Sequence, residues 1–333
     1  MQKLSYLTES RLYCHVLEYD NKLFFSLVDY RNSLFTSNNP DKIIDFYNGF
    51  KDRDELIEWM RERPKGANYL YEVEGNKDII VVITTADYNG RYALNCREAV
   101  FKGLFMIFVE SGGRDDYYFN YAYNSNLGIK KALEYNPKWI VLSNDDVYKI
   151  DEISVLQEKL MNLDNEKYDV VFTIPSRYHS IPVFFGEQNA LRKLYFCLRS
   201  QRLKQLKIET KFNVTFFSSP IRGTGAIFFK HTHRHLSIAS FGIFSSKFIR
   251  ARQGILFDDL YVNSAEDIDL SLELTLDKRR YEVIDYRIGD NIGLTLGTNV
   301  SRKIRDVAGY AYLNYKIKEG KHPISYAVLN SRE

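Results

Sequence analysis

The sequence predicts an α/β fold built on a mainly parallel sheet with helices on both faces. Three apolar, strand-like runs rich in β-branched residues follow one another, and each leads into a turn and a segment of helical character. Each run also ends in polar or acidic residues, which a sheet serving only as a scaffold would not require. Because the carboxyl ends of parallel strands meet at one edge of a sheet, these residues predict a ligand cleft there.

The first part of the chain, residues 1–77, has a mixed pattern. It holds strand-like pieces at 12–16 and 23–28, and a helical stretch at 52–63 that Pro64 ends. We expect an α+β extension that packs on the main domain.

The main domain is expected to span residues 78–297, and a helical tail to fill 298–333. Within the main domain the pattern alternates between strand and helix, in the order strand 79–85, helix 92–102, strand 104–109, helix 126–135, strand 139–147, helix 149–163 and strand 168–174. The tail is expected to be helical over 302–318, with a packing role only.

Size and composition limit the class of protein. With 333 residues and 45% hydrophobic content, the chain can bury a large core. No apolar stretch approaches the roughly 20 residues that a membrane-spanning helix needs, and residues 1–5 do not open a signal-peptide hydrophobic region. These observations predict a cytoplasmic protein.

The net charge of +3 hides a strongly basic segment. Residues 176–256 carry fourteen Lys and Arg against two acids, Glu187 and Glu209, which favours a polyanionic neighbour. Within it, residues 191–207 form a basic amphipathic stripe, which fits either an ordinary surface helix or peripheral contact with a membrane. Nucleic acid is not the expected partner, because no nucleic-acid-binding module accompanies the charge.

The strand-like run that begins at Trp139 ends in Asn144, Asp145 and Asp146. Carboxylates are costly to bury unpaired, so two of them at the end of a buried strand indicate contact with water, a cation or a ligand. Oxygen ligands of this kind suit Mg²⁺ or Mn²⁺, and Mg²⁺ takes only one or two protein carboxylates together with phosphate oxygens and water. An acidic pair also occurs in capped helices and solvated turns, so the pair alone does not decide the function.

Four segments in order resemble the motifs of a known family. They are Thr84-Thr85-Ala86-Asp87-Tyr88-Asn89, then Asn126-Leu127-Gly128-Ile129 with Ala132, then Asn144-Asp145-Asp146, and finally Gly254 to Asp259 followed by Glu266-Asp267-Ile268-Asp269-Leu270. Together they resemble the nucleotide-binding first loop, the N-x-G helix start, the D-x-D motif and the E-D-x-D-L segment of family 2 glycosyltransferases. The resemblance covers about residues 78–297 and implies the GT-A fold, a Rossmann-like sheet between helices.

The resemblance also implies site residues. Asp146 matches the metal ligand, and Asp145 matches a contact to the ribose or a second metal contact. The positions that match the nucleotide site are Thr84, Thr85, Ala86, Tyr88, Asn89, Glu110, Asn126, Gly128, Asn144 and Asp145.

The resemblance implies that Asp267 is the catalytic base, with Glu266 and Asp269 as further candidates. Without the resemblance, a helix cap is the preferred explanation of the same acids, because Ser264 would be an N-cap and acids are favoured in a first helical turn. Three positions depart from the family pattern. Glu110 stands for an Asp, Asn144 stands for an acid, and Asp290 or Asn291 stands where the family often has a His.

The function implied is transfer of a sugar from a UDP- or GDP-sugar to a hydroxyl of a glycan, glycolipid or protein acceptor. The implied mechanism inverts the anomeric carbon and uses a divalent cation, Mn²⁺ or Mg²⁺, on the diphosphate. Two alternatives stay open. One is a nucleotidyltransferase of related fold, and the other is a non-catalytic nucleotide- or glycan-binding protein.

Overall fold

The computed structural model of the chain describes residues 30–113, 116–173, 241–262, 264–276, 280–291 and 300–318. The strand-like pieces predicted at 12–16 and 23–28 lie outside these residues, as does the basic stripe at 191–207.

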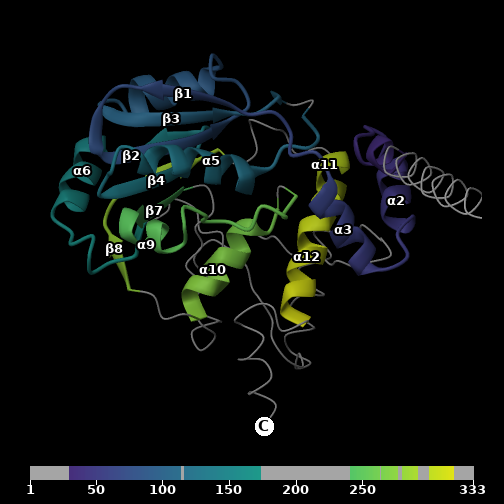
Figure 1. Cartoon of the computed structure of the whole chain (residues 1–333). Coiled ribbons are helices and arrows are strands. Elements are labelled where there is room, and N and C mark those ends of the chain that lie inside the picture. Colours follow the sequence, from purple (N-terminus) through teal and green to yellow (C-terminus); the bar gives the residue numbers. More distant parts are fainter. Residues whose placement is uncertain are drawn as a thin grey trace, which may run out of the picture.

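A seven-stranded sheet forms the centre of the molecule (Figure 1). Its strand order is β1-β3-β2-β4-β7-β6-β8. The strands are β1 (Tyr69–Val73), β2 (Asn76–Thr85), β3 (Leu104–Glu110), β4 (Trp139–Asn144), β6 (Val170–Thr173), β7 (Phe241–Ser245) and β8 (Tyr281–Ile284). β2 pairs in parallel with β3 and β4, and β6 with β8, whereas β1 and β7 are antiparallel to their neighbours. The predicted α/β class is confirmed, and the sheet is mixed because β1 and β7 run against the other strands.

The central strand β2 is buried on both faces. Ile80 and Val82 face one layer of the core, and Ile79, Val81 and Ile83 face the other. This alternation follows from the period of two along a strand. A run of branched apolar residues is therefore what a doubly covered parallel strand requires, and the first three predicted strands are confirmed at the places expected.

Helices cover both faces of the sheet, which gives three layers (Figure 1). α5, α9 and α10 pack on one face, and α4, its π-helical continuation η1 and α6 pack on the other. Their bounds are α4 (Arg91–Asn95), η1 (Cys96–Val100), α5 (Tyr121–Leu133), α6 (Ile153–Met161), α9 (Ser246–Ala251) and α10 (Glu266–Leu276).

Two predicted helix starts are wrong. α5 begins at Tyr121 rather than at Asn126, because the side chain of Asn120 accepts a hydrogen bond from the Tyr123 amide and caps the helix five residues earlier. The helix predicted from Lys149 is α6, which begins at Ile153. The residues before it form β5 (Val147–Lys149), which pairs antiparallel with β9 (Ile288–Asp290) in a separate two-stranded sheet.

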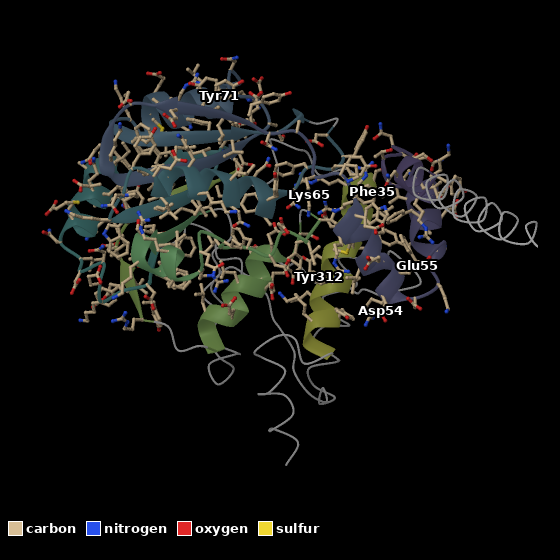
Figure 2. All side chains as sticks on the ribbon, viewed as in Figure 1. Phe35, Asp54, Glu55, Lys65, Tyr71 and Tyr312 are labelled. Carbon is tan, nitrogen blue, oxygen red and sulfur yellow. The ribbon has the colours of Figure 1, made fainter. Side chains whose placement is uncertain are left out.

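A second hydrophobic core joins the two ends of the described chain. Helices α2 (Pro40–Asn48) and α3 (Arg53–Glu62) pack against α11 (Val300–Arg305) and α12 (Val307–Lys318). Phe35 lies on the N-terminal side of this helical cluster, and Tyr312 lies on α12 (Figure 2). The helices predicted at 52–63 and 302–318 are confirmed as α3 and as α11 with α12, and they share one core.

The predicted extension 1–77 contributes to two places in the fold. Its helices α2 and α3 belong to the helical cluster, whereas β1 forms an edge of the sheet by pairing with β3. The tail from residue 298 packs in the same cluster. None of the helices in the described ranges has both the length and the apolar character needed to cross a bilayer.

Candidate functional site

The carboxyl ends of β2, β3 and β4 lie side by side. Thr84 is paired with Asn144 of β4, and Thr85 with Glu110 of β3. From β2 the chain passes to β3 through α4 on one face, and α5 then leads from β3 to β4 on the other face. The direction of the connections therefore reverses at β2, which has β3 on one side and β4 on the other, and in open α/β sheets such a switch point is where ligands bind.

The two adjacent aspartates lie at this switch point and are almost fully buried, each at 3% exposure. The hydroxyl of Thr85 donates to Oδ2 of Asp145 at 2.6 Å, so the β2 and β4 ends are tied together by side chains. The thiol of Cys96 donates to the Asp145 carbonyl at 3.3 Å. Burial raises the pKa of Cys96, and the charges of Asp145 and Asp146 raise it further, so this thiol is a protonated structural group.

The strand β9 brings Asp290, and Asn291 directly after it, next to this pair. The amide of Asn291 donates to the carbonyl of Asp146 at 3.1 Å, and Asp290 pairs with Val147 of β5. The structure therefore places Asp290 and Asn291 beside the aspartates, although residues 292–299 lie outside the described ranges.

The loop after β2 is held by Glu110. Its carboxylate accepts a hydrogen bond from the Tyr88 amide at 2.6 Å. The rings of Tyr88 and Tyr71 stack with their centroids 4.1 Å apart, and Tyr71 is labelled in Figure 2. The Arg97 guanidinium lies 4.2 Å from the centroid of the Tyr88 ring. The predicted nucleotide residues Thr84, Thr85, Ala86, Tyr88, Asn89 and Glu110 are thus brought together in one loop and strand end.

Two other predicted nucleotide residues have packing roles. The Asn126 side chain accepts from the amides of Leu256 and Phe257 at 2.9 and 3.1 Å and donates to the Phe257 carbonyl at 2.8 Å. Gly128 lies so close to the sheet that a Cβ there would be 2.4 Å from Val82. In the N-x-G pattern, Asn126 therefore holds the 254–259 segment on α5, and Gly128 lets α5 approach the sheet closely.

The start of α10 is not capped by Ser264. The Ser264 hydroxyl instead donates to the Asp306 carbonyl at 2.7 Å. Ala265, the residue before the helix, has a φ of 70°, which is rare for a residue with a side chain. A Cβ on Gly309 of α12 would lie 2.2 Å from the Ser264 carbonyl oxygen, so α12 approaches this turn as closely as backbone allows. Non-glycine residues in this region store strain of about 1–3 kcal/mol and cluster at functional sites.

The three acids of α10 have different environments. Glu266 is 7% exposed, and burial followed by the charge of Asp267 raises its pKa to about 8. Asp269 pairs with Lys316 of α12 at 2.6 Å. Asp267 is half-buried, and it is the most open to solvent of the three. At neutral pH Glu266 is mostly protonated and Asp269 is neutralised by Lys316, so Asp267 is the best placed of them to accept a proton.

Lys316 also pairs with Asp258 at 3.3 Å, and the Tyr312 hydroxyl donates to the same carboxylate at 2.8 Å. Burial by itself lowers the pKa of Lys316, but Asp269 and Asp258 outweigh it and raise the pKa. Through Lys316, α12 therefore contacts two of the acidic segments in the family resemblance, the 254–259 segment at Asp258 and the start of α10 at Asp269.

The buried Tyr121 of α5 responds to charges from two acidic regions, the start of α10 and the end of β4. Burial raises its pKa, and the carboxyl groups of Glu266, Asp267 and, more weakly, Asp146 raise it further. These carboxyl groups come from α10 and from the end of β4, so acids from both regions influence the Tyr121 phenol. Burial raises the pKa of Tyr310 of α12, and the charges of Asp267, Asp306 and Glu266 raise it further. Sequence reasoning missed Tyr121 as a site residue, because an aromatic residue on an apolar helix face resembles core.

The acidic pair suits a cation that arrives with its phosphate ligands. The described residues include no group of three or more His, Cys, Asp or Glu side chains that could hold a metal ion by themselves. Two carboxylates at a strand end are nevertheless enough for Mg²⁺ when a diphosphate and water complete the shell. The chemistry of Asp146 and Asp145 therefore fits the predicted Mn²⁺ or Mg²⁺.

A separate cavity of about 390 Å³ lies on the outer side of α5. It is lined by Tyr123, Asn126, Leu127, Lys130, Arg252, Ile255, Phe257, Asp258 and Asp259. Tyr123, Leu127 and Lys130 lie on the side of α5 opposite Gly128, which faces the sheet. This cavity is therefore distinct from the strand-end site.

Comparison of the chain with models of known protein families and with curated proteins gives no match in either case.

Proposed function

We propose that the chain is a glycosyltransferase of the GT-A type that moves a sugar from a UDP- or GDP-sugar to a hydroxyl acceptor. The observation that carries the proposal is the buried pair of aspartates at the switch point, together with an acidic helix start on α10, which packs on one face of the same sheet. Asp146 follows β4 and Asp267 lies in the first turn of α10, and the charges of both raise the pKa of the buried Tyr121 phenol. Transfer with inversion needs charge stabilisation at the leaving diphosphate and a base on the opposite side of the sugar. Asp146 would serve the first need and Asp267 the second.

Asp146 would hold a divalent cation, with Asp145 beside it fixed by Thr85. A bound cation supplies Lewis-acid stabilisation of the departing diphosphate. The loop from Thr84 to Asn89, held by Glu110, would contact the nucleoside. Asp267 would take the proton from the attacking acceptor hydroxyl, and the Lys316 pair keeps Asp269 out of that role. A glycan, a glycolipid or a protein could supply this hydroxyl.

The first experiment is calorimetric titration of UDP, GDP and their sugar conjugates with and without Mn²⁺. The wild type is compared with Asp146→Asn, and Asp54→Asn is the control because Asp54 is an exposed acid on α3 (Figure 2). We expect metal-dependent binding that is at least tenfold weaker in Asp146→Asn and unchanged in Asp54→Asn. Absence of nucleotide binding by the wild type with any metal would overturn the proposal.

A second variant separates transfer from binding. Asp267→Asn should bind the donor as tightly as the wild type while losing about 10²–10⁴-fold in transfer rate, the usual contribution of a general base. Product analysis distinguishes the alternatives, because a nucleotidyltransferase would release pyrophosphate from a nucleoside triphosphate. A non-catalytic binding protein would bind donor without turning it over in either variant.

A further inference from the structure

The cavity on the outer side of α5 lies between this helix and the segment 254–259. Two contacts at opposite ends set the direction of that segment. A Cβ on Gly254 would lie 3.2 Å from Cγ of Lys130, and Asn120 donates a side-chain hydrogen bond to the Asp259 carbonyl at 2.7 Å. The segment therefore runs antiparallel to α5. Lys130 and Asp259 both line the cavity, so Lys130 lies at one end of it and Asp259 at the other.

The body of the cavity is apolar. Leu127 of α5 lines it together with Ile255 and Phe257 of the segment, and Ile255 is 44% exposed although Phe257 is buried. The half-buried Tyr123 adds an aromatic ring that contacts no other aromatic side chain within the described ranges. The volume of about 390 Å³ falls within the roughly 300–1,000 Å³ of small-molecule sites, which are mostly apolar with a few polar groups. An exposed isoleucine and an unstacked tyrosine in such a cavity indicate a ligand with an apolar body.

Most polar groups of the lining already have partners in the protein. The side-chain oxygen and nitrogen of Asn126 are both bonded to the backbone of Phe257. Arg252 pairs with Glu273 of α10, and its Nε donates to the Ile255 carbonyl at 3.2 Å. A ligand rich in hydroxyl groups, such as a sugar, would therefore find few free partners here and would lose its own hydrogen bonds to water.

The charges of the lining leave one cation over. Asp258 pairs with Lys316 at 3.3 Å, and Asp259 faces Lys65 at 3.8 Å. Lys130, by contrast, is exposed and has no ion pair or hydrogen bond in the part of the chain that the structure describes. The end of the cavity at Lys130 therefore favours an anion.

We infer that this cavity binds a small organic anion, namely a flat apolar ring system that carries a single acidic group. The acidic group pairs with Lys130, and the rings lie against Leu127 and Ile255 and reach Tyr123. Tyr123 precedes Lys130 by two helical turns, or about 10 Å along α5, which sets the length of the ligand. The site is separate from the aspartates that follow β4, so this inference does not depend on the proposed function.

The test uses two dyes of similar shape. Anilinonaphthalene sulfonate is an anion, and phenylnaphthylamine is its neutral counterpart. We expect the wild type to bind the anionic dye saturably, and a fluorescence titration to show about fivefold weaker binding of this dye by Lys130→Met, since an ion pair open to water is worth up to about 1 kcal/mol. The affinity of Lys130→Met for the neutral dye should equal that of the wild type.

Matched variants control for the position of each change. Lys131→Met removes the neighbouring lysine, which pairs with Glu72 and Glu134 and does not line the cavity, and it should leave both affinities unchanged. Ile255→Ser removes apolar surface from the wall and should weaken the binding of both dyes by about fivefold. Ile150→Ser, at an isoleucine elsewhere that is 38% exposed, should weaken neither.

Chemical labelling of the wild type locates the dye without any variant. Saturating anionic dye should slow the acetylation of Lys130 severalfold, as measured by mass spectrometry. Lys102, an exposed lysine that follows η1 on the other face of the sheet, should react at the same rate with and without dye. Equal acetylation of Lys130 with and without dye would overturn the inference. So would an unchanged affinity for the anionic dye in either Lys130→Met or Ile255→Ser, even where the dye protects Lys130.

Discussion

Thr85 shows how one hydroxyl positions an acidic motif. It is 3% exposed, it donates to Asp145, and its oxygen also accepts from the Asp87 amide at 3.2 Å. The end of β2 and the end of β4 are thus joined by a charge-assisted hydrogen bond, which is stronger than a neutral one.

We expect Thr85→Val to destabilise the protein by about 1–3 kcal/mol, because the variant keeps the branched shape but removes one donor from a buried carboxylate. Thr85→Ser retains the hydroxyl and should lose less than half as much. Urea denaturation of the three proteins measures the difference. A valine variant as stable as the wild type would show that Asp145 does not depend on this bond.

Glu266 gives stability a pH dependence whose sign follows from its raised pKa. The unfolded state has the ordinary pKa of 4.5, whereas burial and Asp267 raise it to about 8 in the folded state. Between these values the folded state holds the proton more tightly, so this residue makes the folded protein less stable as the pH rises.

Glu266→Gln should therefore be more stable than the wild type at pH 8, by roughly 1–5 kcal/mol, and the two should converge near pH 4. Thermal or urea denaturation from pH 4 to pH 9 checks this. Glu98→Gln, a change of an exposed acid on η1, should show no such divergence. A constant difference between Glu266→Gln and the wild type over this range would contradict the assignment.

At the scale of elements, α12 fixes the acidic start of α10. Gly309 permits the close approach to Ser264, and Lys316 pairs with Asp269 and Asp258. The side chain of Lys316 is 17% exposed and that of Asp269 is 9% exposed, so the pair is mostly shielded from water. Removing one partner of such a pair leaves a charge that is poorly solvated.

Lys316→Met should destabilise the protein by roughly 2–4 kcal/mol near pH 7, less than for a fully buried pair because Asp258 is partly exposed. The folded-state pKa of Lys316 is raised above its ordinary 10.5, so its contribution is complete below 10.5 and is lost as the pH rises through the folded value. The gap between wild type and variant should be level from pH 7 to pH 10 and should narrow above that. Lys316→Met/Asp269→Asn should recover part of the loss. A single methionine variant as stable as the wild type at pH 7 would refute this role.

At the scale of the whole molecule, α10 joins two cores. Ala265 and Ile268 pack in the helical cluster, whereas Leu270 and Leu274 pack on the sheet. In Figure 1, α10 accordingly lies between the sheet and α12. Arg63 adds a second link, because its buried guanidinium donates to the Tyr261 carbonyl at 2.9 Å. The two cores should therefore unfold together.

Tyr47 tests this coupling. Its hydroxyl donates to the carbonyls of Ile304 and Arg305, each at 2.8 Å, and accepts from the Ala308 amide at 3.1 Å. Tyr47→Phe should lower the free energy of unfolding by about 1–3 kcal/mol, because it leaves buried backbone groups without their partner. Tyr30→Phe, at a site that is 60% exposed, is the control.

The two tryptophans report on the two cores separately, since Trp59 lies in the helical cluster and Trp139 in the sheet core. Measured in single-tryptophan backgrounds, Tyr47→Phe should shift both denaturation midpoints by the same amount. Separate midpoints would show that the helical cluster and the sheet are independent units.

The sequence alone predicted the α/β class, the strands β2, β3 and β4 and the acidic pair, because these depend on local periodicity and on where a strand ends. It placed the start of α5 wrongly, since a single Asn cap decided that boundary. It did not indicate that Lys316 of α12 would pair with both Asp258 and Asp269, or that Glu266 would be buried. Burial and ion pairs arise only when segments far apart in the chain pack together, and so only the tertiary structure showed that Glu266 and Asp269 are buried while Asp267 stays half-exposed.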